Sequence, residues 1–279
     1  MSIELPEASI LAEQMQRELV GKTVISWSLN ELEKLQKSKM VSRPLENFDK
    51  LVGRTIRYVV SRGNGIRVIL DDGMNLFIAP EYGGSLRYIK DDSELPKKIH
   101  LKITFADTSL LTVRLKGWGN IDAASDTELE DNYVYRRDFS DVVSPDETRF
   151  TLEWFSGQMS ENSKNIKMAL VGKEAILVGL QNSAFQDLIY QAGIHPKKKA
   201  SELTVDQIEG LYKAIISWVR DRKQFGGKDQ FSDLYGVQGT YTPSMCPNMK
   251  DSTCPKCGSS IEKLAHGGGH VYLCPKCQK

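Results

Sequence analysis

Cys254-Pro-Lys-Cys257 and Cys274-Pro-Lys-Cys277 are two Cys-x-x-Cys pairs with sixteen residues between them. Each pair lets two thiolates reach one ion from a tight turn, and two pairs complete a tetrahedral shell of four sulfurs. Two disulfides are the alternative, but zinc fits a reducing compartment better. A closed shell leaves no position for a reacting water. The spacing therefore predicts a zinc ribbon that holds one structural Zn²⁺.

Composition limits the remaining possibilities. The chain has 279 residues, of which 40% are hydrophobic and 26% are charged, as in ordinary globular proteins. This length predicts two domains with a small appendage. No apolar run is long enough for a membrane span, and the start MSIELPEASI lacks the pattern of a secretory signal. We therefore expect a cytoplasmic or nucleoid-associated protein with no membrane partner.

Net charge does not decide whether the partner is a nucleic acid. Thirty-seven Lys and Arg against 36 Asp and Glu give +1, whereas a dedicated nucleic-acid-binding domain is usually more basic. Basic residues do gather locally, because residues 246–279 contain five lysines against Asp251 and Glu262. The leftover thiol, Cys246, is interpreted as a small apolar residue.

The first half of the chain combines one helix with many short strands. Apolar residues at helical spacing, followed by Gly21, predict a helix over residues 5–20. Alternating and β-rich runs predict strands at Arg54–Val60, Gly65–Leu70, Met74–Ala79 and near residues 101–105 and 111–115, with Asp72-Gly73 as a hairpin turn. This order predicts a β-sandwich or barrel that is capped by the helix.

The second half is interpreted as helical. The acidic residues 120–148 have weak periodicity and are expected to end the β-domain and form a linker. A short helix is expected at Ala184–Gln191, and a capping box of Thr204 and Gln207 is expected to open a longer helix that ends at Gly226-Gly227.

Several stretches together resemble the Fpg/Nei group, which comprises formamidopyrimidine-DNA glycosylase and endonuclease VIII. The similar stretches keep their order along the chain: Glu4-Leu5-Pro6-Glu7, Leu19–Thr23, Gly84–Arg87, Val178–Asn182, Ala192–Pro196 and the ribbon Cys254–Gln278. The resemblance implies an α+β protein with three parts. These are an N-terminal β-sandwich domain with a leading helix (residues 1–135), a helix–two-turn–helix domain (136–240) and the zinc ribbon (241–279).

The resemblance also implies base-excision chemistry on a flipped, damaged base. In the family, an N-terminal proline amine attacks the sugar C1′ and forms a Schiff base, and the adjacent glutamate serves as acid and base. Glu4 and Glu7 match the two family glutamates, and Asn182 matches an asparagine that binds phosphate. Other interpretations are also open: Glu4 and Glu7 can accept backbone N–H groups at the first helix, and Asn182 can be a helix N-cap.

Departures from the family pattern fall at its chemical centre. Ser2-Ile3 replaces the proline, so an amine of Ser2, exposed if Met1 is removed, is one residue from the family position. Asn64 stands at the position of a phosphate-binding lysine, and Gly269 at that of the ribbon arginine. Ala79 and Tyr82 replace the histidine and methionine of the loop whose apolar wedge fills the gap in the base stack. These substitutions remove the amine and two charge-assisted phosphate contacts.

The remaining nucleic-acid-binding candidates are weaker. Tyr82 can stack on a base or pack on its own sheet. Lys197 and Lys198 can contact phosphates or form a solvated face. Asn64 and His270 are retained as candidates from their aligned positions in the hairpin and the ribbon.

Two functions stay open from the sequence. The first is a nucleic-acid-binding protein on the glycosylase scaffold, with lost or altered lyase and glycosylase chemistry. The second is an active glycosylase that uses Glu4 and the Ser2 amine. The expected partner is damaged or bent duplex DNA, with RNA or a ribonucleoprotein as alternatives, and a monomer is expected.

Overall fold

The chain folds into two compact units. The computed structural model describes residues 3–41, 43–91 and 95–279. Unit 1 comprises Met1–Ser140 and Lys223–Thr240, and unit 2 comprises Asp141–Arg222 and Tyr241–Lys279. The predicted α+β class is confirmed, whereas the three domain boundaries stay a prediction. A search of the described helices found none with the length and apolar character that a membrane crossing requires.

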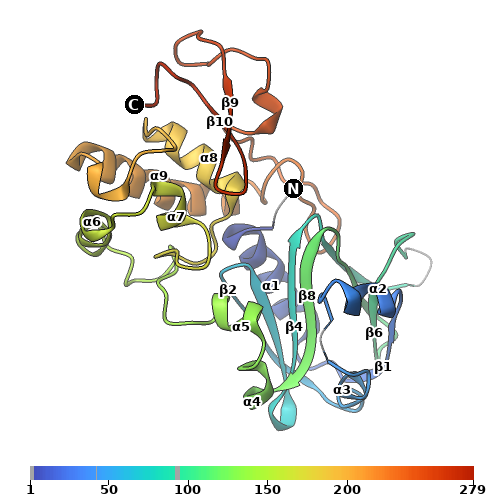
Figure 1. The fold of residues 1–279 in the computed structure, drawn as a ribbon. Coiled ribbons are helices and arrows are strands. Elements are labelled where there is room, and N and C mark those ends of the chain that lie inside the picture. The colour runs from blue at the N-terminus through green and yellow to red at the C-terminus, as the bar shows by residue number, and fades with distance from the viewer. Residues whose placement is uncertain (1–2, 42, 92–94) are drawn as a thin grey trace. The chain divides into compact units, whose positions relative to one another are not determined.

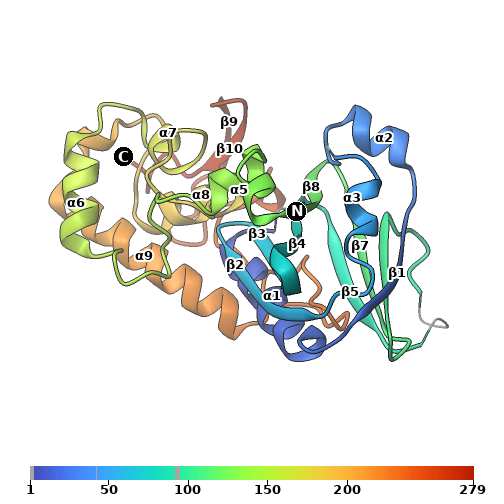
Figure 2. The same cartoon turned by 90° about the horizontal axis from the view of Figure 1, so that it is seen from below.

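Two antiparallel sheets form the centre of unit 1. One has the strand order β1-β6-β7-β5 and the other β2-β3-β4-β8. Figure 1 shows β4 and β8 side by side, and Figure 2 shows β1 at the outer edge of its sheet. The strands are β1 (Val24–Leu29), β2 (Ile56–Arg62), β3 (Gly65–Leu70), β4 (Met74–Tyr82), β5 (Ser85–Ile89), β6 (Leu101–Phe105), β7 (Leu110–Arg114) and β8 (Trp118–Ser125).

Alternating apolar residues bury one face of each sheet in a common core. Val68 and Leu76 from one sheet and Ile103 and Phe105 from the other belong to a single buried cluster. Period-2 alternation places such residues on one face of a strand. The predicted β-sandwich is therefore confirmed, including the hairpin turn at Asp72-Gly73, where Asp72 takes a left-handed conformation (φ 52°).

Helix α1 (Leu5–Leu19) packs on β2 and contributes its buried face to this core. The predicted helix over residues 5–20 ends one residue earlier, because Val20 has an extended conformation and Gly21 follows with φ +85°. The other helices of unit 1 are α2 (Leu32–Lys37), α3 (Glu46–Asp49), α4 (Asp126–Leu129) and α5 (Tyr133–Asp138).

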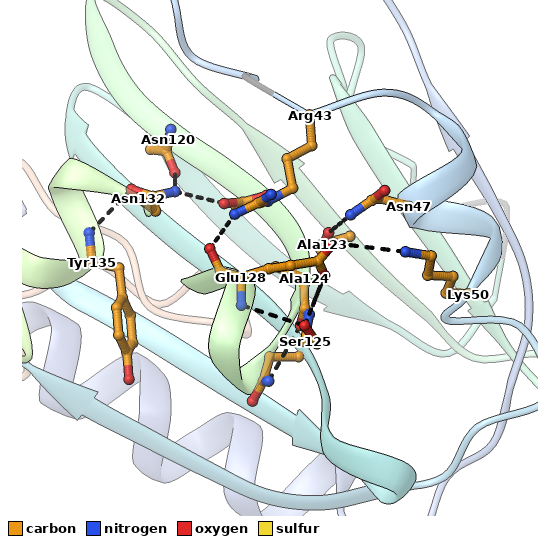
Figure 3. Close-up of polar contacts among 12 residues, drawn as sticks. Arg43, Asn47, Lys50, Asn120, Ala123, Ala124, Ser125, Glu128, Asn132 and Tyr135 are labelled. Atoms are coloured by element: carbon orange, nitrogen blue, oxygen red, sulfur yellow. Dashed lines mark hydrogen bonds and ion pairs between the residues drawn. The ribbon is translucent and has the colours of Figure 1, made fainter. Parts of the chain in front are cut away.

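Residues 120–148 were predicted to end the β-domain and form a linker; they do end it, but two short helices follow where the linker was expected. Residues 118–125 form strand β8, and α4 and α5 follow it. Asn132 caps α5 and donates from Nδ2 to Asn120 and Asp122, each at 2.8 Å, and Arg43 forms an ion pair with Asp122 at 3.0 Å (Figure 3). Burial raises the pKa of Asp122. Buried hydrogen bonds between polar residues, which periodicity does not detect, hold this segment.

Unit 2 is helical and carries a β-hairpin. Its helices are α6 (Leu152–Glu161), α7 (Ile166–Leu170), α8 (Asn182–Gln191) and α9 (Val205–Gln224), and its strands are β9 (Glu262–His266) and β10 (Gly269–Leu273). Helix α9 begins at the predicted capping box, where the Gln207 N–H donates to Thr204 and the Thr204 N–H donates to Gln207. Phe155 of α6 packs against Tyr212 of α9 with ring centroids 6.2 Å apart.

Candidate functional site

Glu4 and Glu7 form a capping box at the start of α1. The Glu4 carboxylate accepts a backbone N–H from the first turn, and the Glu4 N–H donates to Glu7 Oε2 at 3.1 Å. Pro6 fits the first turn because its missing N–H has no intrahelical partner to lose. Both glutamates are fully buried. The backbone-bonding interpretation of these residues is therefore confirmed, and a catalytic role for them stays a prediction.

Lys228 joins both glutamates from a distant part of unit 1. Its Nζ lies 3.2 Å from Glu4 Oε2, and its backbone N–H donates to Glu7 Oε1, also at 3.2 Å. The side chains of Lys228 and Glu4 are 5% and 0% exposed. Burying a charge is costly unless it is paired and hydrogen-bonded, and here the Lys228 ammonium pairs with the buried Glu4 carboxylate while the Lys228 backbone N–H donates to that of Glu7. The arrangement places a primary amine beside a proton acceptor, away from water.

Sequence analysis did not identify Lys228. The only local hint in the sequence is that Lys228 directly follows Gly226-Gly227, a pair that was interpreted only as the end of a helix. Lysines after helix ends are usually solvated. A separation of 224 residues between Lys228 and Glu4 leaves no local pattern to detect.

Ile3 occupies the position just before these glutamates and is tied to the end of β4. Its backbone N–H donates to the Glu81 carbonyl oxygen at 2.6 Å, and its side chain is 1% exposed. The Glu81 side chain forms an ion pair with Arg137 at 2.5 Å, and Arg137 also pairs with Asp138 at 2.7 Å. Ser2, the candidate amine, lies outside the described residues.

Asn64 lies in the turn between β2 and β3 and is buried. Its N–H donates to Asp138 Oδ2 at 3.3 Å. Its own side-chain oxygen has no hydrogen-bond partner among the described atoms. Burial raises the pKa of Asp138, although Arg137 opposes the shift. Asn64 is therefore buried and bound through its backbone to Asp138, which pairs with Arg137. Little of its surface can contact a phosphate.

Asn182 is the first residue of α8, and Gln181 precedes it as the N-cap. The N-cap interpretation of Asn182 is therefore wrong: its Nδ2 donates to the His270 carbonyl oxygen of β10 at 3.1 Å instead. The same helix binds the hairpin again through Gln186, whose side-chain oxygen accepts the Tyr272 N–H at 2.9 Å. Asn182 Oδ1 is buried and has no partner among the described atoms. Asn182 thus links the start of α8 to the ribbon.

The four ribbon cysteines converge on one point. Their sulfurs lie within 4.8 Å of one another, with 3.8 Å between those of Cys254 and Cys277. Zn–S bonds of about 2.3 Å in a tetrahedron require sulfurs about 3.8 Å apart, whereas a disulfide requires about 2.05 Å. The geometry fits the predicted zinc site. Among the described residues, no histidine joins this cluster.

The zinc site is anchored to α8 and the turn after it. Tyr190 of α8 places its hydroxyl 3.2 Å from Cys254 Sγ. Gln278 accepts the Cys274 N–H at 2.9 Å and donates to the Ile194 carbonyl oxygen at 3.0 Å. These contacts hold the ribbon against α8 and the turn after it within unit 2.

Lys167 of α7 reaches the tip of the ribbon hairpin. Its Nζ donates to the His266 carbonyl oxygen at 2.7 Å, and a Cβ added at Gly269 would lie 3.9 Å from this Nζ. Burial lowers the pKa of Lys167. The missing cation at Gly269 is visible in the sequence, but Lys167 is not, because the two positions are 102 residues apart.

Tyr82 and Trp118 form an exposed aromatic pair where β4 meets β8. The two residues are cross-strand partners, and their exposed fractions are 50% and 71%. Gly117 has φ +75°, and a Cβ there would lie 2.7 Å from Tyr82 Cδ1, so only glycine lets the ring approach the turn. Trp118 was missed in the sequence, where its flanking glycines were the available signal.

The basic run after α8 lies at the surface. Lys197 is exposed, and Lys198 is partly exposed, with its Nζ donating to Gln207 Oε1 at 2.8 Å. His195 and Pro196 precede them in a turn, and the Lys197 N–H donates to His195 Nδ1 at 3.3 Å. Contact between these lysines and phosphate stays a prediction.

Comparison with known proteins gives three family matches along the chain. Residues 3–118 match the formamidopyrimidine-DNA glycosylase N-terminal domain, 142–228 its H2TH domain, and 251–279 a zinc finger found in FPG and IleRS. The chain belongs to the Fpg/Nei family. Together with the four-sulfur cluster, the zinc-finger match identifies a structural Zn²⁺ site in this Fpg/Nei chain.

Individual relatives match the Fpg/Nei chain over its whole length. Formamidopyrimidine-DNA glycosylases from Bacillus licheniformis and Brevibacillus brevis are each 28% identical to it, with 99% of both chains covered. A solved complex of Lactococcus lactis Fpg with abasic-site DNA has a TM-score of 0.83 at 23% identity and 99% coverage of both chains. At that identity, the structural likeness concerns the fold.

Proposed function

We propose that this Fpg/Nei chain binds duplex DNA at damaged or bent sites, and that the amine chemistry of its family is lost or altered in it. The observation that carries the altered chemistry is the hydrogen bond from the Ile3 N–H to the Glu81 carbonyl oxygen. A mid-chain amide in this place has no free lone pair with which to attack a sugar carbon, unlike the terminal amine that the resemblance implies. The relatives named as formamidopyrimidine-DNA glycosylases and the solved complex with abasic-site DNA support the choice of DNA.

The proposed DNA contacts come from residues in both units. Tyr82 and Trp118 offer exposed aromatic faces for stacking on bases beside a lesion. Lys197 and Lys198 offer cations for backbone phosphates, whereas the buried Lys167, together with Asn182, holds the ribbon hairpin in place. We also propose a cytoplasmic location, since a tetrathiolate zinc site suits a reducing compartment.

Fluorescence anisotropy tests this function directly. Labelled duplexes with a tetrahydrofuran abasic analogue, with 8-oxoguanine or without damage, and a labelled RNA hairpin, are titrated at one fixed salt concentration. We expect tighter binding to a damaged duplex than to the intact duplex or the RNA. Equal affinity for the three duplexes and the RNA hairpin would contradict the proposal. Tighter binding to the RNA than to any duplex would identify RNA, not DNA, as the partner.

Substitution of Trp118 tests the proposed contact surface. Because each base–aromatic stack contributes about 1–3 kcal/mol, Trp118→Ala should weaken binding to the damaged duplex roughly 5- to 150-fold. The matched control is Tyr58→Ala, since Tyr58 is another exposed aromatic residue of unit 1, 62% exposed on β2. Equal losses for the two variants would contradict this contact surface.

The second candidate function is hydrolysis of the bond between a damaged base and its sugar, with Glu4 transferring the proton. The burial of Glu4 next to a cation supports it, because a desolvated carboxylate can be held ready for proton transfer. Release of a damaged base from the duplex, lost in Glu4→Gln, would support this candidate. Tight binding without any base release would rule out this candidate and support the binding function only.

A further inference from the structure

Lys228 is a buried primary amine that the proposed binding surface does not use. It lies 3.2 Å from Glu4 Oε2 and is held by its own backbone N–H on Glu7. Lysine side chains removed from water and placed next to a proton acceptor are the amines that form Schiff bases with carbonyl compounds. The geometry thus has the two groups that such a reaction needs, a nucleophile and a base.

The backbone around Lys228 fixes the position of this amine. Gly227 has φ +93°, and a Cβ there would lie 2.4 Å from the Phe231 ring, so the turn into Lys228 requires glycine. Phe231 and Leu234 are buried in the core of unit 1. Gln14 of α1 donates to Asp233 at 2.7 Å. The segment that carries Lys228 is therefore attached to the helix that carries Glu4, which keeps the two groups in register.

We propose that Lys228 is the amine nucleophile of this chain toward the aldehyde of an abasic site in DNA. This inference rests on the proposed function, because abasic DNA must first bind. Glu4 takes a proton from Lys228 Nζ, the freed lone pair adds to the aldehyde carbon C1′, and Glu4 passes that proton to the former carbonyl oxygen. Glu4 accepts a proton from the nitrogen and returns one to the departing oxygen. One water leaves and a C1′=N bond joins the lysine to the sugar.

Burial makes this reaction conditional on DNA. Lys228 is 5% exposed and Glu4 is 0% exposed in the free protein, so an aldehyde in solution does not reach the amine freely. The proposal therefore includes a local rearrangement of the side chains around Lys228 Nζ when an abasic nucleotide enters, while Phe231 and Leu234 keep the backbone of the segment anchored in the core.

Borohydride trapping with peptide mapping tests the assignment. The full-length protein is incubated with a duplex that carries a true abasic site, borohydride is added, and the cross-linked peptide is identified by mass spectrometry. Borohydride transfers hydride to C1′ and turns the imine into a stable secondary amine. We expect the adduct on Lys228. An adduct on the N-terminal amine, or on another lysine, would overturn the proposal.

Lys228→Arg is the informative variant because arginine keeps the positive charge next to Glu4 but forms no Schiff base. We expect it to give no adduct, with its binding to the abasic duplex measured separately by anisotropy. The matched control is Lys223→Arg, since Lys223 lies five residues earlier, at the end of α9, and forms a surface pair with Glu13 at 2.6 Å. This control should be trapped at the wild-type yield.

Anisotropy on the same proteins separates the two proposals. Binding without any adduct in the wild type overturns the role of Lys228 and leaves the binding function intact. An undiminished adduct in Lys228→Arg also overturns it. Absence of binding to any damaged duplex overturns the proposed function, and this inference with it.

Discussion

A single lysine determines the electrostatics at the start of α1. Without Lys228, Glu4 and Glu7 would be two fully buried carboxylates within one helical turn that lack this cation. Like charges buried together disfavour ionisation and destabilise the fold. Lys228 offsets this repulsion, and it comes from a part of the chain that no local pattern connects to α1.

Removal of this cation should destabilise unit 1. We expect Lys228→Ala to lower the free energy of unfolding by about 3–5 kcal/mol, the usual cost of leaving a buried charge without its partner. Thermal unfolding followed by circular dichroism in the presence of zinc measures the loss. Lys223→Ala breaks an exposed pair and should cost no more than about 1 kcal/mol. Equal losses for the two variants would contradict the importance of the buried pair.

His100 should make the stability of unit 1 depend on pH. Burial lowers the pKa of His100 from 6.5, and its Nδ1 accepts the Leu115 N–H at 2.9 Å, a role that requires the unprotonated nitrogen. Because the unfolded state binds the proton more tightly, the contribution of this residue is complete above pH 6.5 and is lost as pH falls below it. His100→Gln should reduce the slope of stability against pH between pH 7 and pH 5. An unchanged slope would show that His100 does not contribute.

At the scale of elements, α8 and the zinc hairpin depend on each other. Gln186 and Asn182 hold β10, Tyr190 contacts Cys254, and Gln278 reaches back to Ile194. A hairpin of this size has too small a core to fold alone, so the metal must supply much of its folding free energy.

Zinc removal should therefore unfold the hairpin. After chelation we expect trypsin to cleave at the exposed Lys256, Lys263 and Lys276 much faster than in the zinc-loaded protein. Cys274→Ser should behave like the chelated protein. Cys246→Ser should behave like the wild type, because Cys246 lies outside the sulfur cluster. Equal cleavage rates with and without zinc would contradict a structural role for the metal.

Elements with a strong local signal were predicted well. The zinc pairs, the Asp72-Gly73 hairpin and the Thr204 capping box each depend on residues close in sequence, and all three are confirmed. Strand β8 was missed because its residues Asn120 and Asp122 are polar but buried, paired with Asn132 and Arg43. Lys228, Lys167 and Trp118 could not be predicted, since their roles depend on partners or exposure that only the folded chain defines.

At the scale of the whole molecule, the resemblance to the Fpg/Nei group predicted the fold. It did not determine the chemistry. Ordered motifs from Glu4 to Gln278 predicted the Fpg/Nei family, and family matches over residues 3–118, 142–228 and 251–279 confirm it. The same alignment marked Ile3, Asn64 and Gly269 as departures. The structure accounts for two of them physically: the Ile3 amide is bonded to Glu81, and Lys167 lies near Gly269.

Net charge is close to zero, so DNA affinity must come from a few local cations. If Lys197 and Lys198 each neutralise one phosphate, the logarithm of the binding constant should fall with the logarithm of salt concentration with a slope of roughly −2. Substituting either of these lysines by glutamine should reduce the slope by about 1.

A salt titration of binding to an abasic-analogue duplex, run beside the intact duplex, tests most directly whether this is a damage-recognising DNA-binding protein. The account predicts a linear salt dependence for both duplexes and a preference for the damaged one that persists at physiological salt. Absence of binding even at low salt, or a preference that disappears across the titration, would contradict it.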